Sequence, residues 1–332
     1  MSGVSYFLPI EDQSRVAESR RIASIVAERE GLPPDSIAKA AIVASELASN
    51  LLKHADGGEL QIAPLSARGE PGIELLSIDR GPGISNVGHS LRDGHSTAGT
   101  TGTGLGAVRR LSDEFDIYSQ PGKGTIVVSQ IRINTAAEPA LFKIGLTSRP
   151  VSGEAVSGDA WGIRFEKDHV LIMVADGLGH GVLAADASSA AVEAFHRSTE
   201  GSPASLVQVT HEALRGTRGA AVAVASVDFS QARVRFAGLG NIAGTIIATS
   251  ASHSMMSHNG TAGYATPKIK EFVYPWTDES VIVMHSDGLS THWNAAAFPS
   301  LHGHYPSTIG ALLYREMARE RDDACVVVGK KQ

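Results

Sequence analysis

The stretch Ala175-Asp176-Gly177-Leu178-Gly179-His180-Gly181 decides the fold of the C-terminal half of the chain. It follows the apolar run His169–Val174, so the pattern predicts a buried strand that ends in a carboxylate and a glycine turn. Three further acidic positions border apolar runs in the same way: Asp159 in Ser157-Gly158-Asp159, Asp287 after Val281–His285, and the pair Asp322-Asp323 before Ala324–Val328. Any one of them could simply form a turn.

Four carboxylates at the ends of separate buried strands repel one another unless a cation lies between them. Hard divalent cations such as Mg²⁺ and Mn²⁺ take oxygen ligands, and two of them about 4 Å apart can hold a hydroxide that attacks a phosphoryl group. The four motifs, in their order, resemble those of the SpoIIE/RsbX-type PPM serine/threonine phosphatases over about residues 140–328.

That resemblance implies the roles of the acidic residues. Asp176 would bridge two Mn²⁺ or Mg²⁺ ions with help from the Gly177 carbonyl, while Asp287 and Asp322 complete one site and Asp159 contributes to the other. Asp323 could replace Asp322, which is favoured as the first carboxylate of its pair. The family commonly has Asp-Asp-x-Thr where this chain has Asp-Asp-Ala-Cys, which puts the hydrogen bonding around the ligands in question.

Composition excludes several classes of protein. The 332 residues are enough for two domains, and a net charge of −6 with 19% charged residues shows no basic stripe for nucleic acid. The single Cys325 lies in an apolar run, so no intramolecular disulfide can form and the thiol is expected to be an inert core residue. No signal peptide and no apolar stretch of about 20 residues is apparent, which favours a cytoplasmic protein without a membrane span.

The N-terminal half carries three motifs around a predicted helix. Glu46 and Asn50 are four residues apart and would project from neighbouring positions of that helix, although such a pair alone could be a solvated face. Strands are predicted at 60–66 and 72–78, and Asp79-Arg80-Gly81-Pro82-Gly83 follows the second one. An Asp at a strand end can accept a hydrogen bond from an exocyclic amine, while glycines let a flat ring approach the backbone.

The third motif, Gly102-Thr103-Gly104-Leu105-Gly106, opens a predicted helix whose bare N–H groups suit phosphate. A Rossmann fold is the alternative, but no strand precedes this motif. Together the three motifs resemble the N, G1 and G2 boxes of GHKL (Bergerat-fold) ATPases over about residues 16–133, and the stretch 111–128 is similar to RsbT-like and anti-sigma serine kinases.

The GHKL resemblance implies a further set of roles. Asn50 would ligate Mg²⁺ on ATP, Asp79 would bind the adenine amino group, Gly81 and Gly83 would shape the base pocket, and Gly102, Gly104 and Gly106 would line the phosphate lid. Glu46 would be the general base that deprotonates a serine hydroxyl. No phosphoacceptor segment precedes the domain, so a histidine kinase is not expected.

These resemblances predict an α+β protein of two domains: a Bergerat α/β sandwich at 1–134, a linker at 135–140, and a helix-flanked β-sandwich at 141–332. The expected function is partner switching in stress or sigma-factor signalling, in which a STAS-domain antagonist is phosphorylated by one half and dephosphorylated by the other. The alternatives are a phosphatase fused to an anti-sigma module that sequesters a sigma factor, and a silent scaffold. A stressosome-like assembly and a homodimer are further expected associations.

Overall fold

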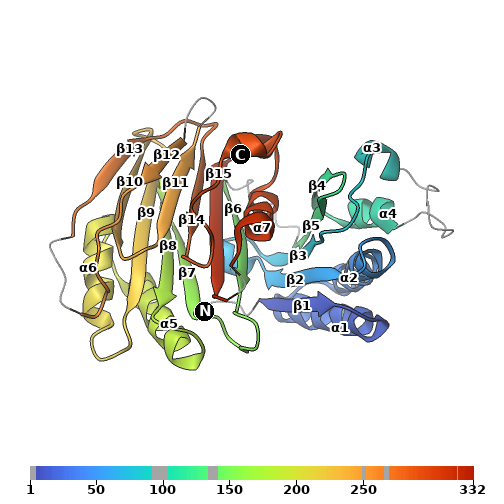
Figure 1. Cartoon of the computed structure of the whole chain (residues 1–332), viewed down its shortest axis with the longest axis horizontal. Coiled ribbons are helices and arrows are strands. Elements are labelled where there is room, and N and C mark those ends of the chain that lie inside the picture. Colours follow the sequence, from blue (N-terminus) through green and yellow to red (C-terminus); the bar gives the residue numbers. More distant parts are fainter. Residues whose placement is uncertain (1–4, 92–103, 134–140, 249–251, 265–268, 320) are drawn as a thin grey trace. The chain divides into compact units, whose positions relative to one another are not determined.

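The structure is a computed structural model that describes residues 5–91, 104–133, 141–248, 252–264, 269–319 and 321–332. It divides into two compact units, Met1–Pro139 and Ala140–Gln332 (Figure 1), and the predicted linker lies outside the described residues. Each unit has its own antiparallel sheet structure and its own hydrophobic core. No described helix is both long and apolar enough to span a membrane.

The first unit is one sheet covered by helices. The strands pair antiparallel in the order β1-β2-β3-β5-β4, with bounds β1 Tyr6–Ile10, β2 Gly58–Pro64, β3 Gly72–Ile78, β4 Glu114–Gln120 and β5 Gly124–Arg132. The helices are α1 Gln13–Arg29, α2 Pro34–His54, the short α3 Val87–Ser90 and α4 Gly104–Leu111. Because every pairing in this sheet is antiparallel, the parallel sheet of a Rossmann fold is ruled out.

Local sequence explains where the helices of this unit begin. The Asp12 carboxylate caps α1 by accepting hydrogen bonds from the backbone N–H groups of Ser14 at 2.7 Å and Arg15 at 3.2 Å. Pro34 occupies the first position of α2, where its missing N–H costs nothing. One face of α2 is apolar and buried against the sheet through residues such as Leu47 and Leu51, which leaves Glu46 and Asn50 half-buried beside that core.

The second unit is a sandwich of two five-stranded antiparallel sheets. One has the order β13-β10-β9-β8-β7 and the other β12-β11-β14-β15-β6. The strands are β6 Phe142–Arg149, β7 Asp159–Phe165, β8 His169–Gly177, β9 Ala220–Asp228, β10 Arg233–Leu239, β11 Ala243–Ile247, β12 Ser252–Met255, β13 Phe272–Pro275, β14 Val281–His285 and β15 Ala324–Lys331.

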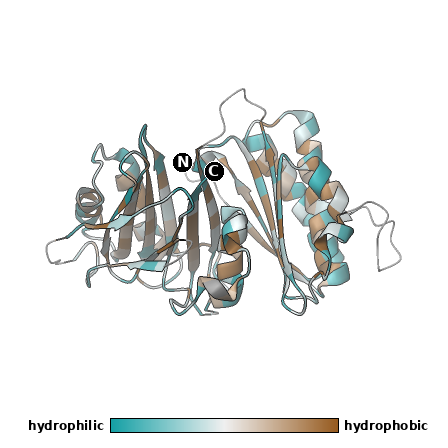
Figure 2. Ribbon diagram, turned by 90° about the horizontal axis from the view of Figure 1, so that it is seen from above, coloured by the Kyte–Doolittle hydropathy of each residue, from teal (hydrophilic) through white to brown (hydrophobic). Residues whose placement is uncertain are grey.

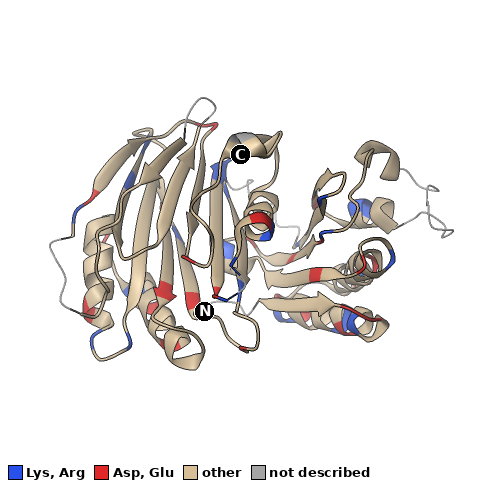
Figure 3. Cartoon of the chain, viewed as in Figure 1, with Lys and Arg blue, Asp and Glu red and all other residues tan. Residues whose placement is uncertain are grey.

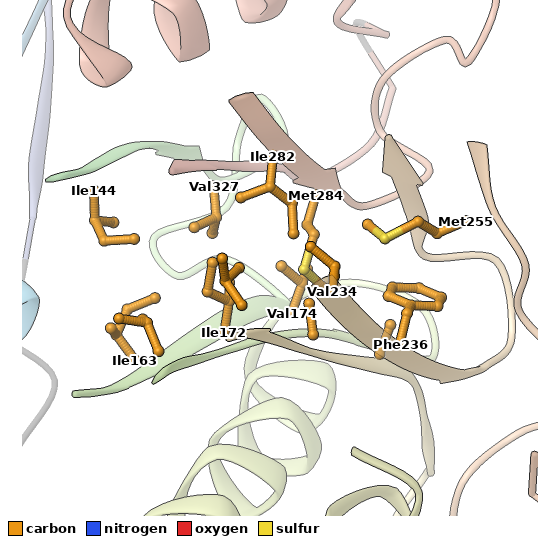
Figure 4. Close-up of a cluster of buried hydrophobic side chains, with 14 of the residues drawn as sticks. Ile144, Ile163, Ile172, Val174, Val234, Phe236, Met255, Ile282, Met284 and Val327 are labelled. Carbon is orange, nitrogen blue, oxygen red and sulfur yellow. The ribbon is translucent and has the colours of Figure 1, made fainter. Parts of the chain in front are cut away.

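Apolar side chains from both sheets interdigitate between them. Ile163, Ile172 and Phe236 on one sheet face Ile282 and Val327 on the other (Figure 4). Helices α5 Val182–Arg197 and α6 Pro203–Ala213 cover the outer face of the β8 sheet through a second apolar cluster. Helix α7 Pro306–Met317 contacts β6 and β15. Colouring by hydropathy shows the strands as predominantly hydrophobic and the helices as mixed (Figure 2).

The predicted fold class is confirmed for both halves. The main differences lie at strands that the sequence pattern did not reveal, namely β1, β4, β12 and β13. The helix predicted after the third glycine motif is α4, which ends at Leu111, and Glu114 already begins β4. Alternation of apolar residues in β4, with Phe115 and Ile117 packed against the core, overrides the weak helical pattern there.

Candidate active sites

The first candidate site lies where α2 meets the start of α4. A Cβ atom at Gly104 would be 3.2 Å from both Glu46 Oε2 and Asn50 Oδ1, so this glycine approaches both side chains closely. The Asn50 side-chain nitrogen is buried and makes no hydrogen bond within the described residues. Leaving this buried amide unpaired costs about 1–3 kcal/mol. Its place at the N-terminus of α4 therefore suits a ligand whose polar group pairs with it.

The second motif of this site is held rigidly at the end of β3. Asp79 Oδ1 accepts hydrogen bonds from the backbone N–H groups of Gly81 at 2.8 Å and Thr125 at 3.0 Å, so the carboxylate is fixed relative to β5. Gly83 has φ of 70° and packs against the Gln120 backbone, which leaves no room for a side chain. Gly106 is buried in α4, whereas Gly102 lies outside the described residues.

These residues fit a nucleotide. The structure brings Glu46, Asn50 and Gly104 together as the sequence predicts, with Asp79 and Gly81 on the neighbouring strand end. Asn50 would hold the magnesium ion on the phosphates and Asp79 would bind the base. Glu46 can take up a proton from a hydroxyl brought to the same point, because its carboxylate lies beside Asn50 rather than in the ring-binding region.

The second candidate site is a cluster of carboxylates at one end of the sandwich. Asp159 at the start of β7 is paired directly with Asp176 near the end of β8, and Asp287 and Asp322 follow β14 and precede β15. The charge of Asp287 acts on both Asp176 and Asp322 and raises the pKa of each. Acidic residues are visible at these strand ends in Figure 3. Residues far apart in the sequence thus form one acidic cluster, as predicted.

Burial and mutual repulsion shift the titration of this carboxylate cluster. Burial, followed by the charges of Asp159 and Asp287, raises the pKa of Asp176 to about 9. Burial, with the neighbouring Asp323, Asp322 and Asp287 charges, raises the pKa of Asp159 to about 8, although a hydrogen bond from Ser286 opposes the shift. Burial and Asp287 also raise the pKa of Asp322. Several buried carboxylates this close together are stable in their ionised form only when a cation offsets their negative charges.

The donor set fits hard divalent cations, which bind carboxylate and carbonyl oxygens. Gly177 offers its carbonyl at the turn, and no side chain fits at this position because a Cβ atom would lie 2.1 Å from the Ala184 oxygen. Within the described part of the chain no three Asp, Glu, His or Cys side chains are already drawn around one point, so the carboxylates would have to rotate toward a bound ion.

Two residues that the sequence analysis did not assign support the carboxylates. Ser286 donates a hydrogen bond to Asp159 Oδ2 at 2.6 Å and accepts one from the Cys325 backbone N–H at 3.1 Å. Asn241 donates to Asp287 Oδ2 at 2.6 Å. Ser286 could have been noticed because it precedes Asp287 in the motif, and together these bonds supply the hydrogen bonding that the sequence left in question. Cys325 is fully buried, and burial raises the pKa of its thiol well above the usual range.

Asp323 has a different role from Asp322. Its Oδ1 accepts a hydrogen bond from the Val151 backbone N–H at 2.7 Å, and its Oδ2 accepts one from Gly158 at 2.8 Å. Both oxygens are therefore engaged with the loop that leads to Asp159. This supports Asp322, the more exposed member of the pair, as the residue that turns toward the cluster.

The Asp323→Ala variant is expected to lose about 2–4 kcal/mol of unfolding free energy, because two backbone donors lose their acceptor at a buried position. Asp323→Asn keeps one acceptor oxygen and should lose roughly half as much. Urea denaturation of the second unit measures both values. An Asp323→Ala variant as stable as Asp168→Asn, a change in the exposed turn between β7 and β8, would contradict this role.

Stability should depend on pH in a direction set by the raised pKa values. The folded protein binds protons on Asp159 and Asp176 more tightly than the unfolded chain, whose carboxyls titrate near 3.8. The stability that these two carboxyls contribute is therefore fully present below about pH 4 and decreases as pH rises through 8 to 9. Without added metal, Tm should fall between pH 5 and pH 9, and excess Mn²⁺ should remove the decrease. A metal-free Tm that does not change between pH 5 and pH 9 would contradict the raised pKa values. The Asp159→Asn/Asp176→Asn protein is the control, and its Tm should not change over this range.

Each half of the chain matches a known protein family. Residues 10–131 match the family model of the histidine kinase-like ATPase domain, HATPase_c_2, and residues 166–330 match that of stage II sporulation protein E, SpoIIE. Over 110 residues the chain is 36% identical to the serine/threonine-protein kinase RsbT of Bacillus subtilis (strain 168), which covers 33% of this chain and 83% of RsbT.

The second half has its own relatives. The chain is 25% identical over 141 residues to the phosphoserine phosphatase RsbX of the same organism, covering 42% of this chain and 70% of RsbX. A solved chain from the bacterial stressosome system has a TM-score of 0.53 and 27% identity, covering 57% of this chain and 99% of its own length. A crystal structure of RsbX with magnesium has a TM-score of 0.51 and 20% identity, covering 59% of this chain and 98% of its own, and shows the shared fold.

Through its first half the chain belongs to the family of RsbT, with a histidine kinase-like ATPase domain, and its second half is a SpoIIE-type PPM domain.

Proposed function

We propose that the chain is a bifunctional partner-switching regulator that acts on a STAS-domain protein. The first unit would transfer a phosphoryl group from ATP to a serine or threonine of that protein, and the second would remove it. The observation that carries the kinase half is the approach of Glu46, Asn50 and Gly104 to one another. The observation that carries the phosphatase half is the carboxylate cluster of Asp159, Asp176, Asp287 and Asp322.

In the kinase half, Glu46 would accept the proton of the substrate hydroxyl while the hydroxyl oxygen attacks the γ-phosphorus of ATP, and ADP would leave. Asn50 orients the phosphates through magnesium, and Asp79 orients the base. A module that only sequestered a sigma factor would not need a carboxylate one helical turn before Asn50, so the position of Glu46 favours the kinase over that alternative.

In the phosphatase half, bound Mg²⁺ or Mn²⁺ would supply an activated water and offset phosphate charge. The residues of the chain would hold and orient those ions. Asp176 and the Gly177 carbonyl lie at the turn, Asp159 is fixed by Ser286, and Asp287 is fixed by Asn241. RsbT and RsbX, whose names denote a kinase and a phosphatase, support placing these opposed activities in one chain.

The deciding experiment incubates the full chain with STAS-domain proteins encoded in the same genome. Each protein is supplied unphosphorylated with ATP and Mg²⁺, or phosphorylated with Mn²⁺, and phosphoserine is followed by intact-mass spectrometry. Gain of one phosphoryl group in the first mixture and its loss in the second would support the proposal. Failure of both reactions with every STAS protein would reject it, and binding of a sigma factor without phosphorylation would favour the sequestering module.

A further inference from the structure

Three large apolar side chains next to the carboxylate cluster are exposed to solvent. Leu178 lies in the turn after Asp176, and Val182 and Leu183 begin α5; their exposed fractions are 45%, 65% and 55%. They do not belong to the core, since the buried face of α5 is formed by other residues such as Ala184 and Ala187. A group of exposed apolar residues beside an active site is typical of a surface that binds a partner.

Arg218 lies against the same turn. A Cβ atom at Gly179 would be 3.2 Å from Arg218 Nη1, and the Leu178 backbone N–H donates a hydrogen bond of 3.1 Å to the Gly219 carbonyl next to that arginine. Arg218 is exposed, and its side chain has no hydrogen bond or ion pair within the described ranges. Arg215, three residues earlier, instead pairs with Glu212 at 2.9 Å.

Arg218 supplies a positive charge for a phosphate beside the carboxylate cluster. The side chains of that cluster, Asp159, Asp176, Asp287 and Asp322, include no cationic group that could bind the phosphoryl oxygens of a phosphoserine dianion directly. The planar guanidinium of an arginine binds two phosphate oxygens at once, and Arg218 reaches the turn that carries Asp176 without first having to leave a partner carboxylate.

We propose that Arg218, Leu178, Val182 and Leu183 form the docking surface for the phosphoserine segment of a protein substrate. Arg218 binds the phosphoryl oxygens, and the three apolar side chains contact the residues that flank the phosphoserine. This inference rests on the phosphatase half of the proposed function, and it names residues that select the substrate.

Position and charge both favour this occupant. The Gly177 N–H donates a backbone hydrogen bond of 3.0 Å to the Gly158 carbonyl, and the Leu178 N–H donates one to the Gly219 carbonyl. The surface is therefore continuous with the strand ends that carry Asp159 and Asp176. A second copy of the chain is a poorer fit, because three apolar side chains supply far less than the roughly 800 Å² per partner of a stable interface, and Arg218 would then face no anion.

Binding can be measured without catalysis. In the Asp176→Asn background, which holds the substrate without turnover, calorimetry compares a STAS-domain protein in its phosphorylated and unphosphorylated forms. The phosphorylated form should bind at least about 10-fold more tightly, and Arg218→Ala should abolish this preference. Arg215→Ala, the matched control, should keep it. Val182→Ser/Leu183→Ser should weaken binding of both forms by about 10-fold.

The proposal is overturned if the Asp176→Asn protein binds the phosphorylated and unphosphorylated STAS-domain protein equally. It is also overturned if, in that background, Arg218→Ala binds the phosphorylated form as tightly as Arg215→Ala does. Activity gives a second readout. Arg218→Ala should raise KM about 10-fold or more for p-nitrophenyl phosphate and for the phosphoprotein alike, whereas Val182→Ser/Leu183→Ser should raise it for the phosphoprotein alone. If the wild-type chain hydrolyses neither substrate, the proposed phosphatase function fails, and the calorimetric preference still decides whether the docking surface exists.

Discussion

The Asp176→Asn variant is expected to lose phosphatase activity by about 10³-fold or more, because an active-site metal contributes several kcal/mol to transition-state stabilisation. Asparagine has the size of aspartate but carries no charge, so it cannot hold two cations at the turn. Initial rates of phosphate release from a phosphoserine STAS protein with excess Mn²⁺ measure the effect.

The same variant should fold at least as stably as the wild type in the absence of metal. Burial raises the pKa of Asp176 to about 9, so at neutral pH this carboxyl, which is ionised in the unfolded chain, must take up a proton when the metal-free protein folds, and a neutral amide removes that cost. Asp168→Asn, at the opposite end of β8, is the matched control and should keep full activity. Activity of Asp176→Asn within about 10-fold of the control would exclude Asp176 from the metal site.

The Glu46→Gln variant is expected to lose phosphoryl transfer to the STAS protein by about 10²- to 10⁴-fold, the usual contribution of a general base. Glutamine retains the length and packing of the side chain beside Gly104 but cannot take up the proton. Binding of ATP should change by less than about 3-fold, because the roles of Asn50 and Asp79 do not depend on the Glu46 charge.

Labelled ATP transfer and nucleotide calorimetry separate these two effects. Asp35→Asn, an exposed acidic position in the first turn of the same helix, is the control and should leave both unchanged. If the Glu46→Gln protein phosphorylates the STAS protein at the same rate as the control, Glu46 is not the general base. Absence of transfer by the wild type, together with retained ATP binding, would instead favour the sequestering module.

Much of the fold followed from the sequence because buried strands such as β8 and β14 are continuous apolar runs followed by an Asp-Gly pair. The run His169–Val174 with its Asp-Gly turn is β8, and Val281–His285 is β14. Strand β12 could not be predicted in this way, because Ser252, His253 and Ser254 are exposed on an edge and carry no apolar alternation. Its position depends on backbone pairing with β11 rather than on its own side chains.

The candidate sites were predictable only in part. The acidic residues stood out because each follows or precedes a buried strand. The separate tasks of Asp322 and Asp323 could not be read from two adjacent carboxylates, since they depend on the Val151 and Gly158 backbone arriving from a distant loop. Arg218 was equally hidden, because nothing in its local sequence indicates that it lies against Gly179.

Two self-contained hydrophobic cores on one chain have a consequence for control. The proposed kinase and phosphatase, made as one polypeptide, would always be present in equal numbers, so a change in expression would scale both activities together. The phosphorylated fraction of a shared substrate would then depend on the ratio of the two turnover rates and hardly on how much of the protein a cell makes. Nucleotide level, metal supply or an upstream signal would set the ratio of the two turnover rates. Fluctuations in gene dosage would leave the phosphorylated fraction of the substrate almost unchanged.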